Sequence, residues 1–214
     1  QALWSEALPI LARLFPPYAE QALELRDRLD RHFLERFWRN RRGWLADVLL
    51  AEPGTPASQG LPDTALRFNQ LAAIQAGMVS IEQARQIVDI ISERLLIPGA
   101  VRSLSEDPLA VPRTILDNQG KLLADPHRPY QGRCEGDETR RRTAYHNGTA
   151  WLWAYPAFIE SRAVAYGYSP MAVRQALAYF EPLWSDLTHS GIGTLGEMLS
   201  LIHISEPTRL RRSS

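Results

Sequence analysis

The sequence contains one cysteine, Cys134, among its 214 residues. No internal disulfide can therefore form, and we expect a reducing, cytoplasmic compartment. The sequence also lacks an excess of either charge, because 24 Lys and Arg residues balance 24 Asp and Glu residues. Since nucleic-acid-binding proteins normally carry a basic excess, we expect no nucleic-acid partner.

Long apolar runs are missing as well. No stretch approaches the roughly 20 apolar residues that a membrane span needs, so no membrane partner is expected. Residues 1–4 are typical of a helix interior and not of a signal peptide, which predicts that the chain begins inside a domain. His and Cys residues do not cluster at metal-ligand spacing, and we expect no metal and no other cofactor.

Apolar residues recur at three- and four-residue steps along most of the chain, which is typical of amphipathic helices. The predicted helices cover about residues 3–15, 18–38, 68–76, 80–95, 149–166 and 170–184. Ser80 and Gln83 have the spacing of a capping box, and Pro170 after Ser169 is a helix-start signal. No segment shows clear strand alternation.

The predicted helices follow one another in pairs, which favours a bundle, a solenoid or an α/α toroid. Residues 98–147 are predicted to be non-helical. Compact domains rarely carry so long a loop unless it shapes a site. We therefore expect an all-α fold, a partial (α/α)6 toroid, with this loop running over one end.

The densest functional signal lies at residues 144–153, where the long loop is predicted to enter a helix. His146 and Asn147 offer hydrogen-bonding groups for sugar hydroxyls. Tyr145, Trp151 and Trp153 offer aromatic faces for the C–H face of a pyranose. The alternative is that Asn147 caps a helix and that the two tryptophans belong to the core.

Two further segments carry polar groups next to a predicted turn. Arg67, Asn69 and Gln70 open a helix after a loop, and would face the same end of the fold. The alternative is ordinary capping by Asn69 and a solvated Arg67. Glu197 follows the glycine-rich segment 191–196, which could hold its carboxylate in a fixed position, although it could equally be a surface residue.

The end of the chain has a different character. Residues 199–209 match, codon by codon, the in-frame translation of a transposon-end sequencing adapter. We therefore expect a domain boundary at residue 198, with a non-native, adapter-derived tail at 199–214.

Taken in order, these segments resemble the C-terminal glucosidase domain of glycogen-debranching enzymes (amylo-α-1,6-glucosidases), which is a six-hairpin glycosidase. The matching words lie at residues 2–4, 37–38, 44–47, 66–71, 95–104, 136–138, 145–151 and 193–197, and the Tyr-His-Asn-Gly-Thr word at 145–149 is the most specific. The resemblance covers nearly all of residues 2–198. Phe68 and Leu152 stand where the family commonly has proline, which bears on subfamily and substrate.

The resemblance implies an (α/α)6 toroid and inverting hydrolysis of α-1,6-linked glucose in glycogen or a branched α-glucan oligosaccharide. It implies that Glu197 is the general base. The implied substrate-binding residues are Arg67, Asn69, Gln70, Tyr145, His146, Asn147 and Trp151. The family's general acid lies upstream of Ala2, so the chain alone is expected to be inactive. Two alternatives stay open: another (α/α)6 glycosidase acting on a small glucoside, and a non-catalytic carbohydrate-binding toroid.

Overall fold

The fold is known from a computed structural model that describes residues 1–189 and 193–199. Residues 190–192 and 200–214, and with them most of the expected tail, lie outside the described residues. The α-helices are α1 (Ala2–Leu14), α2 (Ala19–Phe37), α3 (Leu71–Gln75), α4 (Ile81–Arg94), α5 (Glu138–Ala144), α6 (Ala154–Ala165), α7 (Pro170–Ala178) and α8 (Glu181–His189). Short 3-10 turns cover Pro16–Tyr18, Ala57–Gln59 and Phe68–Gln70. The strands are β1 (Trp38–Arg39), β2 (Trp44–Leu45), β3 (Val48–Leu50), β4 (Leu61–Asp63), β5 (Leu96–Ile97), β6 (Ala100–Arg102), β7 (Ala150–Trp151) and β8 (Met198–Leu199).

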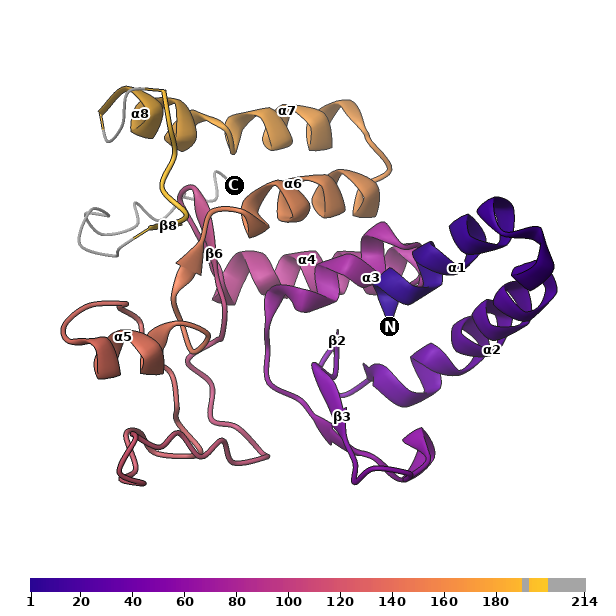
Figure 1. The fold of residues 1–214 in the computed structure, drawn as a ribbon. Coiled ribbons are helices and arrows are strands. Elements are labelled where there is room, and N and C mark those ends of the chain that lie inside the picture. Colours follow the sequence, from indigo (N-terminus) through magenta and orange to yellow (C-terminus); the bar gives the residue numbers. More distant parts are fainter. Residues whose placement is uncertain (190–192, 200–214) are drawn as a thin grey trace.

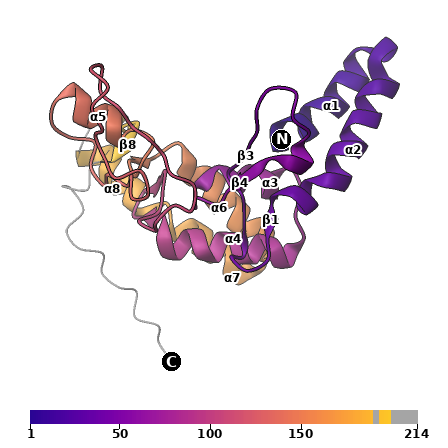
Figure 2. The same ribbon diagram turned by 90° about the horizontal axis from the view of Figure 1, so that it is seen from below.

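The helices form a layer with a hairpin attached at one end. α6 packs against α3, α4 and α7, while α1 and α2 pack against each other as an antiparallel pair. Figure 1 shows α4, α6 and α7 stacked side by side, with α5 and its connections at the opposite end of the molecule from the α1–α2 hairpin. Seen from below, that hairpin projects away from the rest of the fold (Figure 2). Within the described residues, no helix combines the length and the apolar character needed to cross a membrane.

The main core lies where α4 meets α6, and the sequence explains why. Ile87, Val88 and Ile91 lie on one stripe of α4 and are fully buried. Tyr155 and Phe158, one turn apart on α6, cover that stripe in the same apolar cluster. The N-terminus of α4 carries the capping box predicted from Ser80 and Gln83. The helix predictions for residues 3–15, 18–38 and 80–95 are thus confirmed to within one or two residues.

The fold-class prediction is wrong. About 49% of the chain is helical and about 10% is in small antiparallel sheets, which is not an all-α toroid. The largest sheet joins four strands in the order β5-β6-β7-β8. Val101 of β6 pairs with Trp151 of β7, and Trp151 pairs in turn with Met198 of β8. Since Val101 is fully buried, this sheet contributes to the core and does not lie only at the surface.

The strands escaped detection because each spans only two or three residues. Alternation of apolar and polar residues is recognisable only over four to eight residues. β1–β2 and β3–β4 are equally short hairpins that bracket the turn at Gly43 and the loop before Leu61. The pairings of β6 with β7 and of β7 with β8, in contrast, join strands that lie far apart in the sequence, so the information that forms them is not local.

Three element predictions change with this sheet. The predicted loop 98–147 contains β6 and ends with α5, whose first turn is capped by the side chain of Asp137. The helix predicted over 149–166 begins only at Ala154, because Ala150 and Trp151 pair as β7. The helix predicted over 170–184 is divided into α7 and α8 at Tyr179.

Candidate functional site

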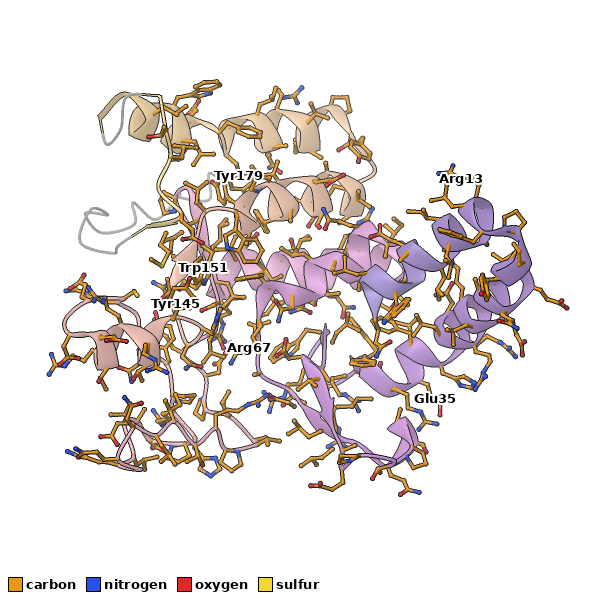
Figure 3. The ribbon with its side chains drawn as sticks, in the orientation of Figure 1. Arg13, Glu35, Arg67, Tyr145, Trp151 and Tyr179 are labelled. Atoms are coloured by element: carbon orange, nitrogen blue, oxygen red, sulfur yellow. The ribbon has the colours of Figure 1, made fainter. Side chains whose placement is uncertain are left out.

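Arg67 joins the two sequence segments that were expected to form the site. It lies in extended backbone just before the 3-10 turn Phe68–Gln70. Its Nη1 donates to the carbonyl oxygen of His146 at 2.6 Å and to that of Ser103 at 3.1 Å. Figure 3 shows Arg67 near Tyr145 and Trp151, far from Arg13 and Glu35 on the helical hairpin. The guanidinium therefore anchors the 145–148 turn to the start of α3, and is not solvated as the alternative supposed.

Asp47 forms a three-residue polar edge with Arg67 and Asn69. Its Oδ2 lies 3.3 Å from Arg67 Nε, and its Oδ1 accepts a hydrogen bond from Asn69 Nδ2 at 2.8 Å. Both members of the ion pair have side chains that are only 13% exposed. Burial raises the pKa of Asp47 and outweighs the opposing effects of the Asn69 hydrogen bond and the Arg67 charge. Burial likewise lowers the pKa of Arg67. For both side chains, the loss of hydration of the charge therefore outweighs the electrostatic attraction between Asp47 and Arg67.

The raised pKa of Asp47 predicts how stability changes with pH. The proton that Asp47 binds stabilises the folded state. This stabilisation is fully present below pH 3.8, the ordinary pKa of the carboxyl group, and it is lost as the pH rises through the higher pKa of the folded state. In Asp47→Asn this dependence is absent. The free energy of unfolding of the native chain minus that of Asp47→Asn should therefore fall as pH rises above 3.8, as measured by urea unfolding at a series of pH values. A difference that grows with pH would contradict the burial argument.

Gln70 is committed to holding the backbone around the site. It is 8% exposed. Its Oε1 accepts from the backbone N–H of Leu45 at 3.2 Å, while its Nε2 donates to the carbonyl oxygen of Arg67 at 2.9 Å. Both ends of the amide are therefore engaged within the protein. Asn69, in contrast, is exposed to solvent although its side chain bonds to Asp47, and it does not cap a helix.

The aromatic residues of the 145–153 segment gather into one cluster. The ring of Trp151 meets that of Tyr145 edge-on at 4.7 Å between centroids, and stacks with that of His146 at 5.9 Å. Trp151 is only 3% exposed, whereas Tyr145 is 37% exposed. Trp153 lies 6.2 Å from Trp151 and is 59% exposed. Trp151 therefore belongs to the core of this cluster, as the alternative supposed for both tryptophans, while Tyr145 and Trp153 reach its surface.

The turn that presents this cluster depends on Asn147 and Gly148. The side chain of Asn147 donates to the carbonyl oxygen of Thr143 at 2.9 Å, so it closes the end of α5 and does not cap a following helix. The carbonyl oxygen of Asn147 accepts from the backbone N–H of Gln131 at 2.6 Å. Gly148 has φ 129°, a conformation that favours glycine, and donates its N–H to the hydroxyl of Ser103.

Glu197 reaches the same region through the small sheet. Its carbonyl oxygen accepts from the backbone N–H of Leu152 at 3.1 Å, next to the β7–β8 pairing of Trp151 with Met198. The residue is exposed. Its backbone therefore bonds to the residue that precedes Trp153, while residues 191 and 192 of its glycine-rich segment lie outside the described residues.

A cleft of about 710 Å³ opens beside the polar edge. Its lining includes Asp47, Arg67, Asn69 and Gln70 together with Trp153. Such a volume is within the range of about 300–1,000 Å³ for small-ligand sites, which combine apolar and aromatic walls with a few polar groups. The remaining predicted site residues do not line this cleft; they are Tyr145, His146, Asn147, Trp151 and Glu197.

Sequence reasoning missed the part played by Asp47. Asp47 lies in the segment 44–47 that resembles the family, but its neighbours in the sequence indicate no role for it. Its partners Arg67 and Asn69 lie 20 and 22 residues away. A carboxylate just after an apolar run was the available signal. Trp153 was recognised as a stacking aromatic but was not assigned to the site. In the ranges 1–189 and 193–199, no group of three or more His, Cys, Asp or Glu side chains is arranged to hold a metal ion.

Two comparisons bear on this arrangement. A family model described as amylo-alpha-1,6-glucosidase matches residues 1–202. The match spans the cleft, the aromatic cluster and β8, and it extends four residues past the boundary expected at residue 198. A comparison with curated proteins finds no match.

Proposed function

The chain belongs to the amylo-alpha-1,6-glucosidase family, and on that premise we propose that it supplies the sugar-binding cleft and the general base of an enzyme that hydrolyses α-1,6-linked glucose. Membership indicates a glycosidase-type function related to glycogen debranching and a glucan substrate. The specific substrate that we propose is glycogen or a branched α-glucan oligosaccharide. We propose that the reaction takes place in the cytoplasm.

The observation that carries this proposal is the bridge made by Arg67. One guanidinium contacts Asp47 at the cleft and the carbonyl oxygen of His146 beside the aromatic cluster, across 79 residues of sequence. It ties a hydrogen-bonding edge to a group of aromatic rings, and this pairing suits a pyranose, which has hydroxyls around its rim and an apolar face. The substrate-binding set we propose is Arg67, Asn69, Gln70, Tyr145, His146, Asn147 and Trp151. Of these, Arg67, Gln70 and Asn147 act at least partly by holding the backbone, and the buried Trp151 acts by supporting the ring of Tyr145.

The proposed reaction needs two carboxyl groups. A carboxylic acid protonates the glycosidic oxygen, while a carboxylate removes a proton from the water that attacks the anomeric carbon from the opposite face. The bond from that carbon to the leaving oxygen breaks as the bond to water forms, which inverts the configuration. The two carboxyl groups stand about 6.5–9.5 Å apart to leave room for the water. We assign the base to Glu197 and the acid to a residue outside this chain.

The test is glucose release from a branched α-glucan limit dextrin. We expect a protein that joins this chain to its upstream acid-bearing segment to release glucose. The chain alone should release it at least about 10²-fold more slowly, which is the usual cost of losing a positioned acid. Trehalose and isomaltose serve as competing substrates in the same assay. Preferred hydrolysis of a small glucoside, or sugar binding with no hydrolysis by the longer protein, would contradict the proposal.

A further inference from the structure

The α1–α2 hairpin covers only one side of α1. The buried residues on that side are Ala2, Ser5 and Leu8. The hydroxyl of Ser5 donates to the carboxylate of Asp30 on α2 at 2.8 Å, which joins the two helices. The opposite side of α1 carries a second apolar stripe, which consists of Leu3, Ala7, Ile10 and Leu14. The three large side chains of this outer stripe are between 50% and 72% exposed.

The outer stripe is continuous and accessible. α1 is a single helix over Ala2–Leu14 although it contains Pro9. At about 100° per residue, Pro9 falls with Ser5 on the side of α2 and outside the stripe. The hairpin projects away from the rest of the fold (Figure 2). A second helix can therefore approach the outer stripe from solvent.

The spacing of the outer stripe is that of a coiled-coil seam. Apolar residues at alternating steps of four and three residues occupy the a and d positions of a heptad, which face a second helix. The a positions are Ala7 and Leu14, and the d positions are Leu3 and Ile10. In an antiparallel pair of identical helices, each a position faces a d position of the other. The small Ala7 then faces the larger Ile10 of the partner subunit.

The residues that flank the outer stripe complement themselves in the same antiparallel arrangement. Glu6 and Arg13 border one edge of the stripe, while Trp4 and Leu11 border the other edge. In an antiparallel pair, each edge meets the same edge of the second copy in reverse order. Glu6 therefore meets Arg13 of the partner subunit, and Trp4 meets Leu11 of the partner subunit. A parallel pair would instead set the charge of Glu6 against Leu11.

We propose that the outer stripe of α1 is a dimerisation surface, on which a second copy of this chain places its own α1 in antiparallel orientation about a two-fold axis. The second copy is the occupant because one helix supplies every complement that the other needs, small to large and acidic to basic. Such a pair is closed, since both stripes are covered at once. Among the described residues, neither Glu6 nor Arg13 has an ion-pair partner within its own chain.

The dimer is expected to be weak. Each helix is about 20 Å long, so the pair is smaller than a standard protein interface. We expect a dissociation constant on the order of 10 µM, at the weak end of the range for specific interfaces. Sedimentation velocity of the full chain, run from about 1 to 100 µM, should therefore show a change from monomer to dimer.

Ile10→Glu tests the centre of the outer stripe. The variant places a carboxylate in the apolar seam of both copies, and we expect dimerisation to weaken at least about 100-fold. The matched control is Leu177→Glu, at a leucine of similar exposure on α7, which lies apart from α1 (Figure 1). Its dissociation constant should equal that of the native chain. Circular dichroism of each variant separates a loss of pairing from a loss of folding.

Reversal of charge tests the orientation of the two helices. Glu6→Arg should weaken the dimer about tenfold, because an attraction becomes a repulsion at two symmetry-related places. Arg13→Glu should have the same effect. The double variant Glu6→Arg/Arg13→Glu should return to within about threefold of the native chain, since the attraction is restored with its signs exchanged. Glu82→Arg on α4 makes the same change of net charge away from α1, and should have no effect.

Four outcomes would overturn the proposal. They are a native chain that stays monomeric at about 100 µM, association that persists in folded Ile10→Glu, and a double charge reversal that fails to restore the dimer. The fourth is a monomeric longer protein that Ile10→Glu destabilises, because the outer stripe would then belong to its upstream segment. All these measurements report mass or folding and not glucose release, so they are independent of the proposed function.

Discussion

Replacing Glu197 by Gln should lower kcat for glucose release by about 10²–10⁴-fold, the usual contribution of a positioned general base. The measurement is made on a longer protein that joins this chain to an upstream segment bearing the proposed acid. Gln keeps the size of the side chain but cannot accept the proton of the attacking water. KM should change little, because the sugar is held by other residues and the lost interaction belongs to the transition state.

The pH profile gives a sharper readout than the rate alone. A bell-shaped dependence of kcat/KM reports one acid and one base, and removal of the base should abolish its acidic limb. The control is Glu82→Gln, at an exposed glutamate in the first turn of α4, which should leave both the rate and the profile unchanged. An unchanged acidic limb in Glu197→Gln would assign the base to another carboxylate, even if the rate had fallen.

Gly148→Ala should destabilise the fold by about 3 kcal/mol. About 1–2 kcal/mol of this comes from placing a side chain at a positive φ, here 129°. The rest comes from collision, which typically costs about 1–3 kcal/mol in a packed site. An added Cβ would lie 2.7 Å from the ring of Tyr130 and 2.9 Å from the carbonyl oxygen of Gln131. The tyrosine ring could rotate away, but the carbonyl belongs to backbone that is bonded to Asn147.

Gly77→Ala provides the matched control, because Gly77 also has a positive φ, 67°, but an added Cβ there would meet no described atom within 4 Å. It should cost only about 1–2 kcal/mol. In a chain of this size each kcal/mol lowers Tm by about 2–4 °C, so thermal unfolding of the two variants should differ by about 5 °C. Equal losses in the two variants would mean that the turn at Gly148 relaxes without strain.

The helices α1, α2 and α4 could be predicted because their signals are local. The stripe of Ile87, Val88 and Ile91 has the helical period, and Ser80 and Gln83 satisfy their backbone partners within one turn. The candidate site could be predicted in part for a related reason. Arg67 and His146 each lie beside a turn, and short polar words at turns are where binding residues concentrate.

The sheet and the polar edge could not be predicted in this way. Val101, Trp151 and Met198 pair as neighbours although they are separated by tens of residues, and each strand is too short to carry a pattern of its own. Asp47 offered no sign of its role, because the pKa of a carboxyl group is set by what surrounds it in space. The prediction of an all-α toroid failed at this point: the connections, which were predicted as loops, contain short strands, and the helix predicted from residue 149 was extended over β7.

The sequence by itself determined that α1, α2 and α4 are helical, where α4 begins, and which short words carry hydrogen-bonding and aromatic groups, because these properties depend on residues within a turn or two of one another. The tertiary structure alone decided that Arg67 reaches both Asp47 and the carbonyl oxygen of His146, and that Trp151 is buried while Trp153 is exposed. The same words could occur in a protein without a cleft. Only the packing of α3, α6 and the small sheet brings them to one place, since burial and contact depend on distance through space and not on distance along the chain.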